Sequence, residues 1–140
     1  MSELFSYFEG NLQDFLCYIR ANIDNTLVKV KLEAFAPDSF IHVLDCFAVR
    51  HILTKHSNEK EVQRGQIIIT ESDFMLIPEI LDSYDSCETT IDPKGRKLLL
   101  YTKEYQDCTR FYVEEIRKGR HELAGVTYYK RKRKLTGAKS

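Results

Sequence analysis

The hydrophobic pattern of this chain changes its period near residue 87, and this change restricts the possible folds more than any other feature. Before that point, apolar residues recur mostly at helical spacing. After it, short runs rich in β-branched and aromatic residues alternate with turn signals. The second half therefore predicts four strands joined by three tight turns, with strands at 87–91, 97–102, 109–116 and 121–130 and turns at 92–95, 105–108 and 118–119.

The first half predicts helices with two strands between them. Helical segments show apolar residues three and four positions apart, whereas the strand segments show either strict alternation or a short apolar run. Capping residues and prolines mark where the helices begin and bend. The expected elements are one or two helices in 5–19 with a break at Gly10, a strand at 26–35, a helix at 45–56 capped by Asp45, a strand at 66–69, and a helix from Thr70 to Leu81 that Pro78 shortens or kinks.

These elements predict one two-layered α+β domain. N-terminal helices should pack on a mainly antiparallel sheet of four to five strands, because each layer must bury its apolar face against the other. With 140 residues and 43% hydrophobic content, the chain can bury one core but is short for two.

Positive charge is concentrated at the C-terminus. The formal net charge of the chain is zero, yet residues 130–140 contain six Lys or Arg and no acidic residue. The preceding part carries 15 basic and 21 acidic residues. A basic tail of this kind can attach a mildly acidic body to a polyanion, or it can be a solvated end that keeps the protein soluble.

Several classes of site are disfavoured by what the sequence lacks. The four cysteines form no Cys-x-x-Cys pair and have no histidine at metal-ligand spacing, which argues against zinc and favours reduced thiols in the cytoplasm. Acidic residues interrupt the apolar positions near the N-terminus, so neither a signal peptide nor a membrane span is expected. We find no P-loop, dinucleotide-binding turn or nucleophile elbow, and we expect no cofactor.

Two of the four histidines, His51 and His56, lie on the helix expected at 45–56 and are candidates for proton transfer. At 100° per residue, His56 falls inside the apolar arc of Val49 and Ile52, and His51 lies toward its edge. A histidine at the end of an amphipathic helix is, however, more often a hydrogen-bonded core or capping residue. Both interpretations stay open at this point.

The last strand supplies two hydroxyl groups. Alternation places Thr127 and Tyr129 on one face, with Gly125 leaving open space beside them, and Tyr128 on the face that should pack against helices. Thr and Tyr are also ordinary strand formers and cross-strand partners. Arg64 precedes a short strand, where it could meet a phosphate or be a surface arginine.

Three segments and the closing strand together resemble the phage-associated branch of the barnase, EndoU, colicin and RelE-like nuclease superfamily. Their order along the chain carries the resemblance, which extends from about Phe40 to Lys130 and leaves residues 1–36 unmatched. The segments are Ile41-His42-Val43-Leu44-Asp45-x-x-Ala48-Val49-Arg50-His51-Ile52-x-x-x-His56, Arg64-Gly65-Gln66-Ile67 with Ile69-Thr70-x-x-Asp73-Phe74, Val113-Glu114-Glu115-Ile116-Arg117, and Glu122-Leu123-Ala124 to Thr127-x-Tyr129-Lys130.

The resemblance implies a helical pair packed on a four-stranded antiparallel sheet whose open face forms an RNA-cleaving cleft. It implies a division into an N-terminal extension of the same domain at 1–36, a nuclease-like domain at 37–130 and a basic, disordered tail at 131–140. It also implies which side chains would act: His51, His56, Arg64, Thr127 and Tyr129.

The leading hypothesis is a metal-independent ribonuclease in which a ribose 2′-hydroxyl attacks its own phosphodiester. One histidine would be the base and the other the acid, with Glu114 or Glu115 as a reserve base. The expected substrate is RNA, with tRNA as one candidate. A toxin of this superfamily, associated with a phage or mobile element, would need an immunity or antitoxin protein. The alternatives are a catalytically inactive nucleic-acid-binding domain and an interaction module that docks a partner at an exposed edge strand.

Overall fold

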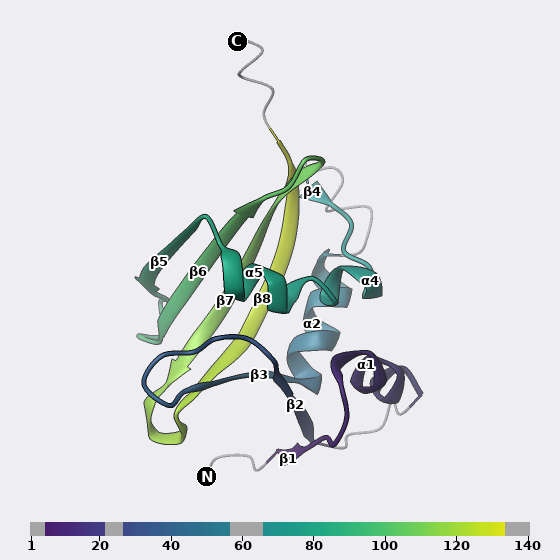
Figure 1. Ribbon diagram of the computed structural model, residues 1–140, viewed down its shortest axis with the longest axis vertical. Coiled ribbons are helices and arrows are strands. Elements are labelled where there is room, and N and C mark those ends of the chain that lie inside the picture. The colour runs from purple at the N-terminus through teal and green to yellow at the C-terminus, as the bar shows by residue number, and fades with distance from the viewer. Residues whose placement is uncertain (1–4, 22–26, 57–65, 134–140) are drawn as a thin grey trace.

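The computed structural model describes residues 5–21, 27–56 and 66–133. Within them the chain forms a mixed sheet with helices packed on it (Figure 1). In chain order the elements are β1 (Ser6–Tyr7), α1 (Leu12–Ala21), β2 (Val28–Leu32), β3 (Ile41–Asp45), α2 (Cys46–His56), β4 (Gln66–Ile67), α4 (Glu71–Phe74), α5 (Ile77–Ser83), β5 (Ser86–Ile91), β6 (Lys97–Glu104), β7 (Cys108–Arg117), the 3₁₀ turn η1 (Lys118–Arg120) and β8 (Glu122–Lys132).

The sheet is larger than expected, because it contains further strands besides the C-terminal meander. Its eight strands follow the order β1-β2-β3-β8-β7-β6-β5, and β4 pairs with β8 beside this path. The pairs β1/β2 and β3/β8 are parallel, and the other pairs are antiparallel. The prediction of an α+β fold is confirmed, but the prediction of a four- to five-stranded antiparallel sheet is wrong, because strands from the first half join the meander.

Strand β3 accounts for most of this difference. From the sequence we assigned no strand to 41–45. In the structure nearly every residue of this strand is buried, so it lacks the one exposed face that makes a half-buried strand recognisable in a sequence. The strand lies between β2 and β8, so both of its edges are paired. Its position joins the N-terminal segment to the C-terminal meander in one sheet.

Local signals predicted where α1 and α2 begin, but not every helix. Of the one or two helices expected in 5–19, one forms, after Gly10, and Ser6–Tyr7 form strand β1 instead. Helix α1 begins at Leu12, directly after Asn11, whose side chain accepts a hydrogen bond from the Asp14 amide at 2.8 Å. Gly10, with a φ of 153°, precedes this cap.

The helix expected from Thr70 to Leu81 is instead two short helices, α4 and α5. Pro78 lies in the first turn of α5, where a helix has no use for its missing N–H. The helix is therefore interrupted before the proline, and α5 begins as a new helix.

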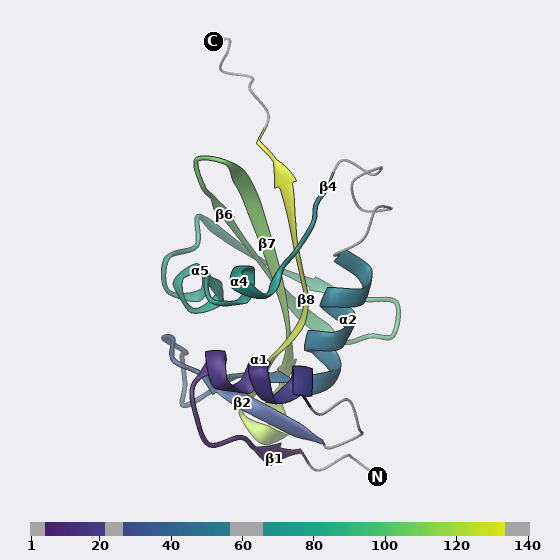
Figure 2. The same ribbon diagram turned by 90° about the vertical axis from the view of Figure 1, so that its right-hand side faces the viewer.

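Helices α1, α4 and α5 lie on one side of the strands, and α2 runs along β8 (Figure 2). The core fills the space between these layers, and its largest fully buried side chains include Phe15, Leu44, Ile52, Phe74, Tyr112 and Tyr128. We call the opposite side of β5 to β8, which is turned away from α4 and α5, the outer face.

Strand β8 continues to Lys132 and pairs with both β7 and β4 near its end. The first residues of the expected tail, Arg131 and Lys132, are therefore part of the sheet. Residues 134–140 lie outside the described residues.

Candidate functional site

Helix α2 carries one of the predicted histidines to the surface. The carboxylate of Asp45 accepts a hydrogen bond from the Ala48 amide at 2.8 Å and so caps the first turn. Val49 and Ile52 are buried in the core, and His51 is exposed, as its angular position predicted. His56 is the last residue of α2, and its side chain lies outside the described residues, as does the whole of Arg64.

Helix α2 packs against β8 (Figure 1), the strand that carries the predicted hydroxyl groups. Strand β3 pairs with residues 122–124 of β8, and β4 pairs with residues 130–131. Between these two partners, that edge of β8 meets no other strand in the described part of the chain. Thr127 and Tyr129 lie in this interval and are half-buried. The fold therefore brings the helix that bears His51 beside the strand that bears Thr127 and Tyr129.

The outer face can be identified from contacts on the other side of the same strands. Lys130 and Tyr128 of β8 and Arg110 of β7 all bond to Asp73 of α4. Because side chains alternate along a strand, Thr127 and Tyr129 point to the outer face.

A β-bulge corrects the expected environment of Gly125. The register between β7 and β8 shifts between Val113 and Glu114, so Val126 has no direct partner. Gly125 is thereby turned to the helix-covered side, where a Cβ would lie 2.2 Å from the Tyr112 hydroxyl. The open space that we expected beside Thr127 is not at Gly125. Instead, that glycine makes room for a core tyrosine.

The same bulge creates an aromatic stack that the sequence did not reveal. Phe111 and Tyr129 are directly opposite each other, with ring centroids 4.9 Å apart and ring planes 14° from parallel. The guanidinium carbon of Arg131 lies 5.6 Å from the Phe111 ring centroid and 5.4 Å from that of Tyr129. Counted from the Arg117–Glu122 pair without a bulge, Phe111 would face Tyr128 instead. Only the shifted register places these three side chains together.

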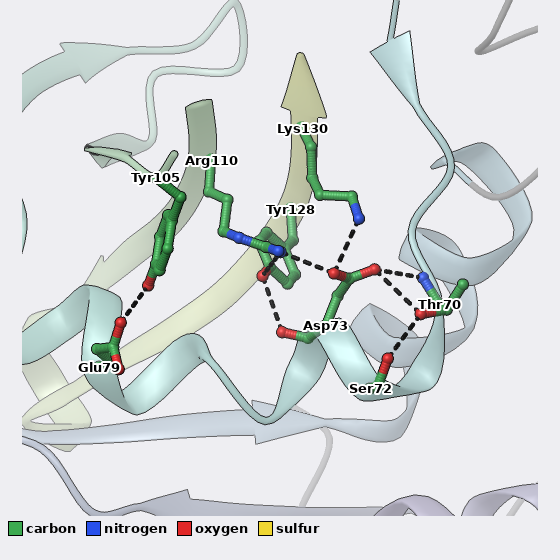
Figure 3. Close-up of polar contacts among 8 residues, drawn as sticks. All are labelled: Thr70, Ser72, Asp73, Glu79, Tyr105, Arg110, Tyr128 and Lys130. Carbon is green, nitrogen blue, oxygen red and sulfur yellow. Dashed lines mark hydrogen bonds and ion pairs between the residues drawn. The ribbon is translucent and has the colours of Figure 1, made fainter. Parts of the chain in front are cut away.

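A buried polar network lies on the helix-covered side beneath this stack (Figure 3). One oxygen of Asp73 accepts hydrogen bonds from Arg110 at 2.8 Å and Lys130 at 2.9 Å, and the other accepts from the Thr70 amide at 2.7 Å. The Tyr128 hydroxyl accepts from Arg110 and donates to the Asp73 carbonyl. The network fixes α4 to β7 and β8.

The electrostatics of this network favour an ionised Asp73. Burial raises the pKa of Asp73, but the hydrogen bonds from the Thr70 amide, Arg110 and Lys130 outweigh burial and hold the pKa below its usual value. Two cations thus share one carboxylate, and Arg131 adds another cation on the outer face. The C-terminal end of β8 is therefore basic within the sheet as well as beyond it.

A second buried network involves His42, which the candidate site did not include. Its Nδ1 lies 2.6 Å from a Glu114 oxygen and its Nε2 lies 2.7 Å from the Phe35 carbonyl oxygen. The other oxygen of Glu114 accepts a hydrogen bond from Tyr101 at 2.8 Å. Glu114 is fully buried on the helix-covered side, so it does not lie with Thr127 as a reserve base would need to.

Glu115, the other reserve base, lies on the outer face. Together with Phe5, Arg117 and Arg120 it lines a surface hollow of about 410 Å³ at the opposite end of this face from Arg131. Within the described residues, no three His, Cys, Asp or Glu side chains are grouped so that they could hold a metal ion. Over the same residues, no helix combines the length and the apolar character that crossing a membrane requires.

The fold and this site define an α+β protein in which a histidine-bearing helix lies beside a sheet face with hydroxyl, aromatic and arginine side chains. A family model described as phage-Barnase-EndoU-ColicinE5/D-RelE like nuclease 3 matches residues 19–137. The chain therefore belongs to this nuclease family. The resemblance of individual motifs starts at about Phe40, whereas the family model matches from residue 19 and so includes β2. No curated protein and no solved structure matches the chain.

Proposed function

We propose that this nuclease is a metal-independent ribonuclease whose site lies on the outer face between α2 and β8. The observation that carries the proposal is the packing of α2 against β8, which brings exposed His51 and half-buried Thr127 and Tyr129 onto neighbouring elements of a nuclease-family fold. We include His56 and Arg64 in the site because of their place in the sequence motifs.

The proposed residue types suit attack of a ribose 2′-hydroxyl on its own phosphodiester. One imidazole, of His51 or His56, removes the hydroxyl proton, and the other protonates the departing 5′ oxygen. Arg64 and the hydroxyl groups of Thr127 and Tyr129 stabilise the extra negative charge of the phosphorane. The products are a 2′,3′-cyclic phosphate and a 5′-hydroxyl end.

The test is incubation of the purified protein with tRNA and with total RNA in EDTA, followed by analysis of the product ends. We expect cyclic-phosphate ends, and rates lowered by about 100-fold or more in His51→Gln and in His56→Gln. His121→Asn, which changes an exposed histidine in the turn before β8, should cleave like the parent. The proposal fails if no cyclic-phosphate end forms, or if both helix variants cleave at the parent rate.

A second candidate is a catalytically inactive domain that binds nucleic acid or a protein. The acidic balance of the chain before Lys130 favours the protein-binding form of this candidate, since binding to a phosphate backbone normally draws on many clustered cations. This candidate predicts binding to RNA, or capture by a protein, without cleavage under any condition tested. Restoration of cleavage by adding back imidazole to His51→Ala or His56→Ala would exclude it.

We also propose that the chain acts in the cytoplasm of a cell that carries a phage or mobile element, as a toxin held in check by an immunity or antitoxin protein. A nuclease acting on cellular RNA would stop growth when expressed alone. We expect growth arrest with the parent chain and normal growth with a His51→Gln, His56→Gln double variant. Equal growth would contradict the toxin role.

A further inference from the structure

The stack of Phe111, Tyr129 and Arg131 lies outside the hydrophobic core of this sheet. The neighbouring cross-strand pair on the helix-covered side, Tyr112 and Tyr128, is fully buried and packs edge to face. By contrast, Phe111 and Tyr129 are half-buried on the outer face, and Arg131 is exposed. Two partly exposed aromatic rings and an exposed guanidinium group are therefore accessible to a ligand.

The geometry of the stack suits a nucleobase. The two rings are nearly parallel, and the planar guanidinium lies within reach of both ring centroids. Unpaired bases are bound in proteins by stacking on aromatic rings or on arginine planes, with cations nearby for the phosphates. Arg131 can stack its guanidinium plane on a base, because it lies near the rings. It can also pair with a phosphate, because it lies at the basic end of β8.

We infer that Phe111, Tyr129 and Arg131 form a nucleobase-stacking platform and that the substrate enters as a single strand. The inference rests on the proposed ribonuclease function and deepens it. Thr127 and Tyr129 are two positions apart on the same face, which puts the platform about 7 Å along β8 from Thr127, with Tyr129 shared between the platform and the proposed site. A base next to the scissile phosphate is held there. Bases inside a duplex are stacked on one another and do not reach this surface.

The experiment uses a short single-stranded deoxyoligonucleotide that contains one 2-aminopurine and lacks the 2′-hydroxyl, so that binding is measured without cleavage. We expect quenching of the 2-aminopurine fluorescence on binding by the parent, and at least about fivefold weaker binding by Phe111→Leu. Phe111→Tyr, which restores a ring, should recover the quenching. Arg131→Lys, which keeps the charge but loses the plane, should weaken binding and reduce quenching.

Lys132→Gln is the matched control, because it removes one positive charge from the neighbouring position of β8 on the other side of the strand. It should lower affinity only as one fewer cation would, with quenching at saturation unchanged. Thermal unfolding shows which variants fold like the parent. If Phe111→Leu does not fold, the platform is tested by comparing the quenching and the affinity of the parent with those of Arg131→Lys.

The outcomes separate this inference from the proposed function. Absence of quenching with the parent, or equal affinity of the parent and a folded Phe111→Leu, overturns the platform even if RNA is cleaved. Equal binding of the single strand and of its perfectly paired duplex also overturns it. Quenching that depends on Phe111 and Arg131 supports the platform even if no cleavage is found, in which case it is the proposed reaction that fails.

Discussion

Buried charged residues connect the layers of this protein, and each depends on its partners. Asp73, Arg110 and Lys130 form one such group, and their side chains are only 7%, 7% and 12% exposed. Because the folded-state pKa of Asp73 is depressed, its stabilisation is present above the ordinary pKa of 3.8 and is lost as the pH falls through the folded-state value. Removing Asp73 leaves Arg110 and Lys130 charged and without the carboxylate that they share, whereas removing either cation leaves Asp73 with the other.

We expect Asp73→Asn to lower the free energy of unfolding by about 3–5 kcal/mol, because Arg110 and Lys130 lose the carboxylate that they share. Urea denaturation at neutral pH measures this change. Glu88→Gln removes an exposed carboxylate of β5 and should change stability by no more than about 0.5 kcal/mol. A small effect of Asp73→Asn, similar to that of the control, would show that the network adds nothing to stability.

The pair of His42 and Glu114 should make stability depend on pH near neutrality. The Phe35 carbonyl can only accept, so Nε2 carries a hydrogen, and one further proton is shared between Nδ1 and the Glu114 carboxyl. Burial alone would lower the pKa of His42, but the Glu114 contact raises it above 6.5 overall. Burial likewise raises the pKa of Glu114. Both shifts mean that the folded state holds protons more tightly than the unfolded state.

This stabilisation is complete below about pH 6.5 and is lost as the pH rises through the folded-state pKa of His42. We therefore expect the free energy of unfolding of the parent to decrease between about pH 6 and about pH 8. The double variant His42→Gln, Glu114→Gln should be less stable overall but change less over this range. His121→Asn should keep the pH dependence of the parent. A parent stability that is constant or rises with pH would contradict the assignment.

At the scale of elements, the position of α2 decides whether a site can exist. The helix begins after the Asp45 cap and packs against β8, so the cap stabilises the first turn of the helix that carries His51. Loss of the cap would let the first turn fray without removing any proposed catalytic group.

We expect Asp45→Ala to lower the free energy of unfolding by about 0.5–2 kcal/mol and to slow RNA cleavage at saturating substrate, because the first turn of α2 loses its capping acceptor. Asp45→Asn keeps an oxygen that can accept from the Ala48 amide and should retain most of the stability and the activity. Denaturation and single-turnover cleavage measure the two effects. If Asp45→Asn is as defective as Asp45→Ala, the carboxylate has a role other than capping.

At the scale of the whole molecule, positive charge follows the end of β8 and continues into residues 134–140. Lys130 is directed inward to Asp73, whereas Arg131 lies over the outer-face rings and Arg133 pairs with Glu104. Since the sheet includes residues up to Lys132, a truncation that tests the tail alone should begin after Arg133.

We expect a chain ending at Arg133 to bind single-stranded oligonucleotides more weakly and with a smaller salt dependence. The slope of log affinity against log salt should fall by about 0.7 for each of Lys134 and Lys139 that contacts a phosphate. Cleavage at saturating RNA should stay at the parent level. Replacing residues 134–140 by uncharged Gly and Ser should have the same effect as truncation. A slope that does not change would show that the tail makes no phosphate contact.

The sequence alone was enough to predict the α+β class, many of the elements and which elements carry the proposed site residues. Helical spacing, the Asp45 cap and the turns of the meander are local signals, because they depend on residues a few positions apart. The family followed from short motifs in a particular order, and the family match agrees with it. The placing of His51 at the surface of α2 likewise needed only the angular period of a helix.

The tertiary structure alone decided the features that depend on distant pairing. Strand β3 is recognisable as a strand only because it pairs with β2 and β8. Strand β8 is about 80 residues further along the chain. One bulge turns Gly125 inward and moves Tyr129 opposite Phe111, since shifting the register by one residue changes every later cross-strand pair. Long-range register is set by the packing of whole layers, and no local pattern in the sequence contains it.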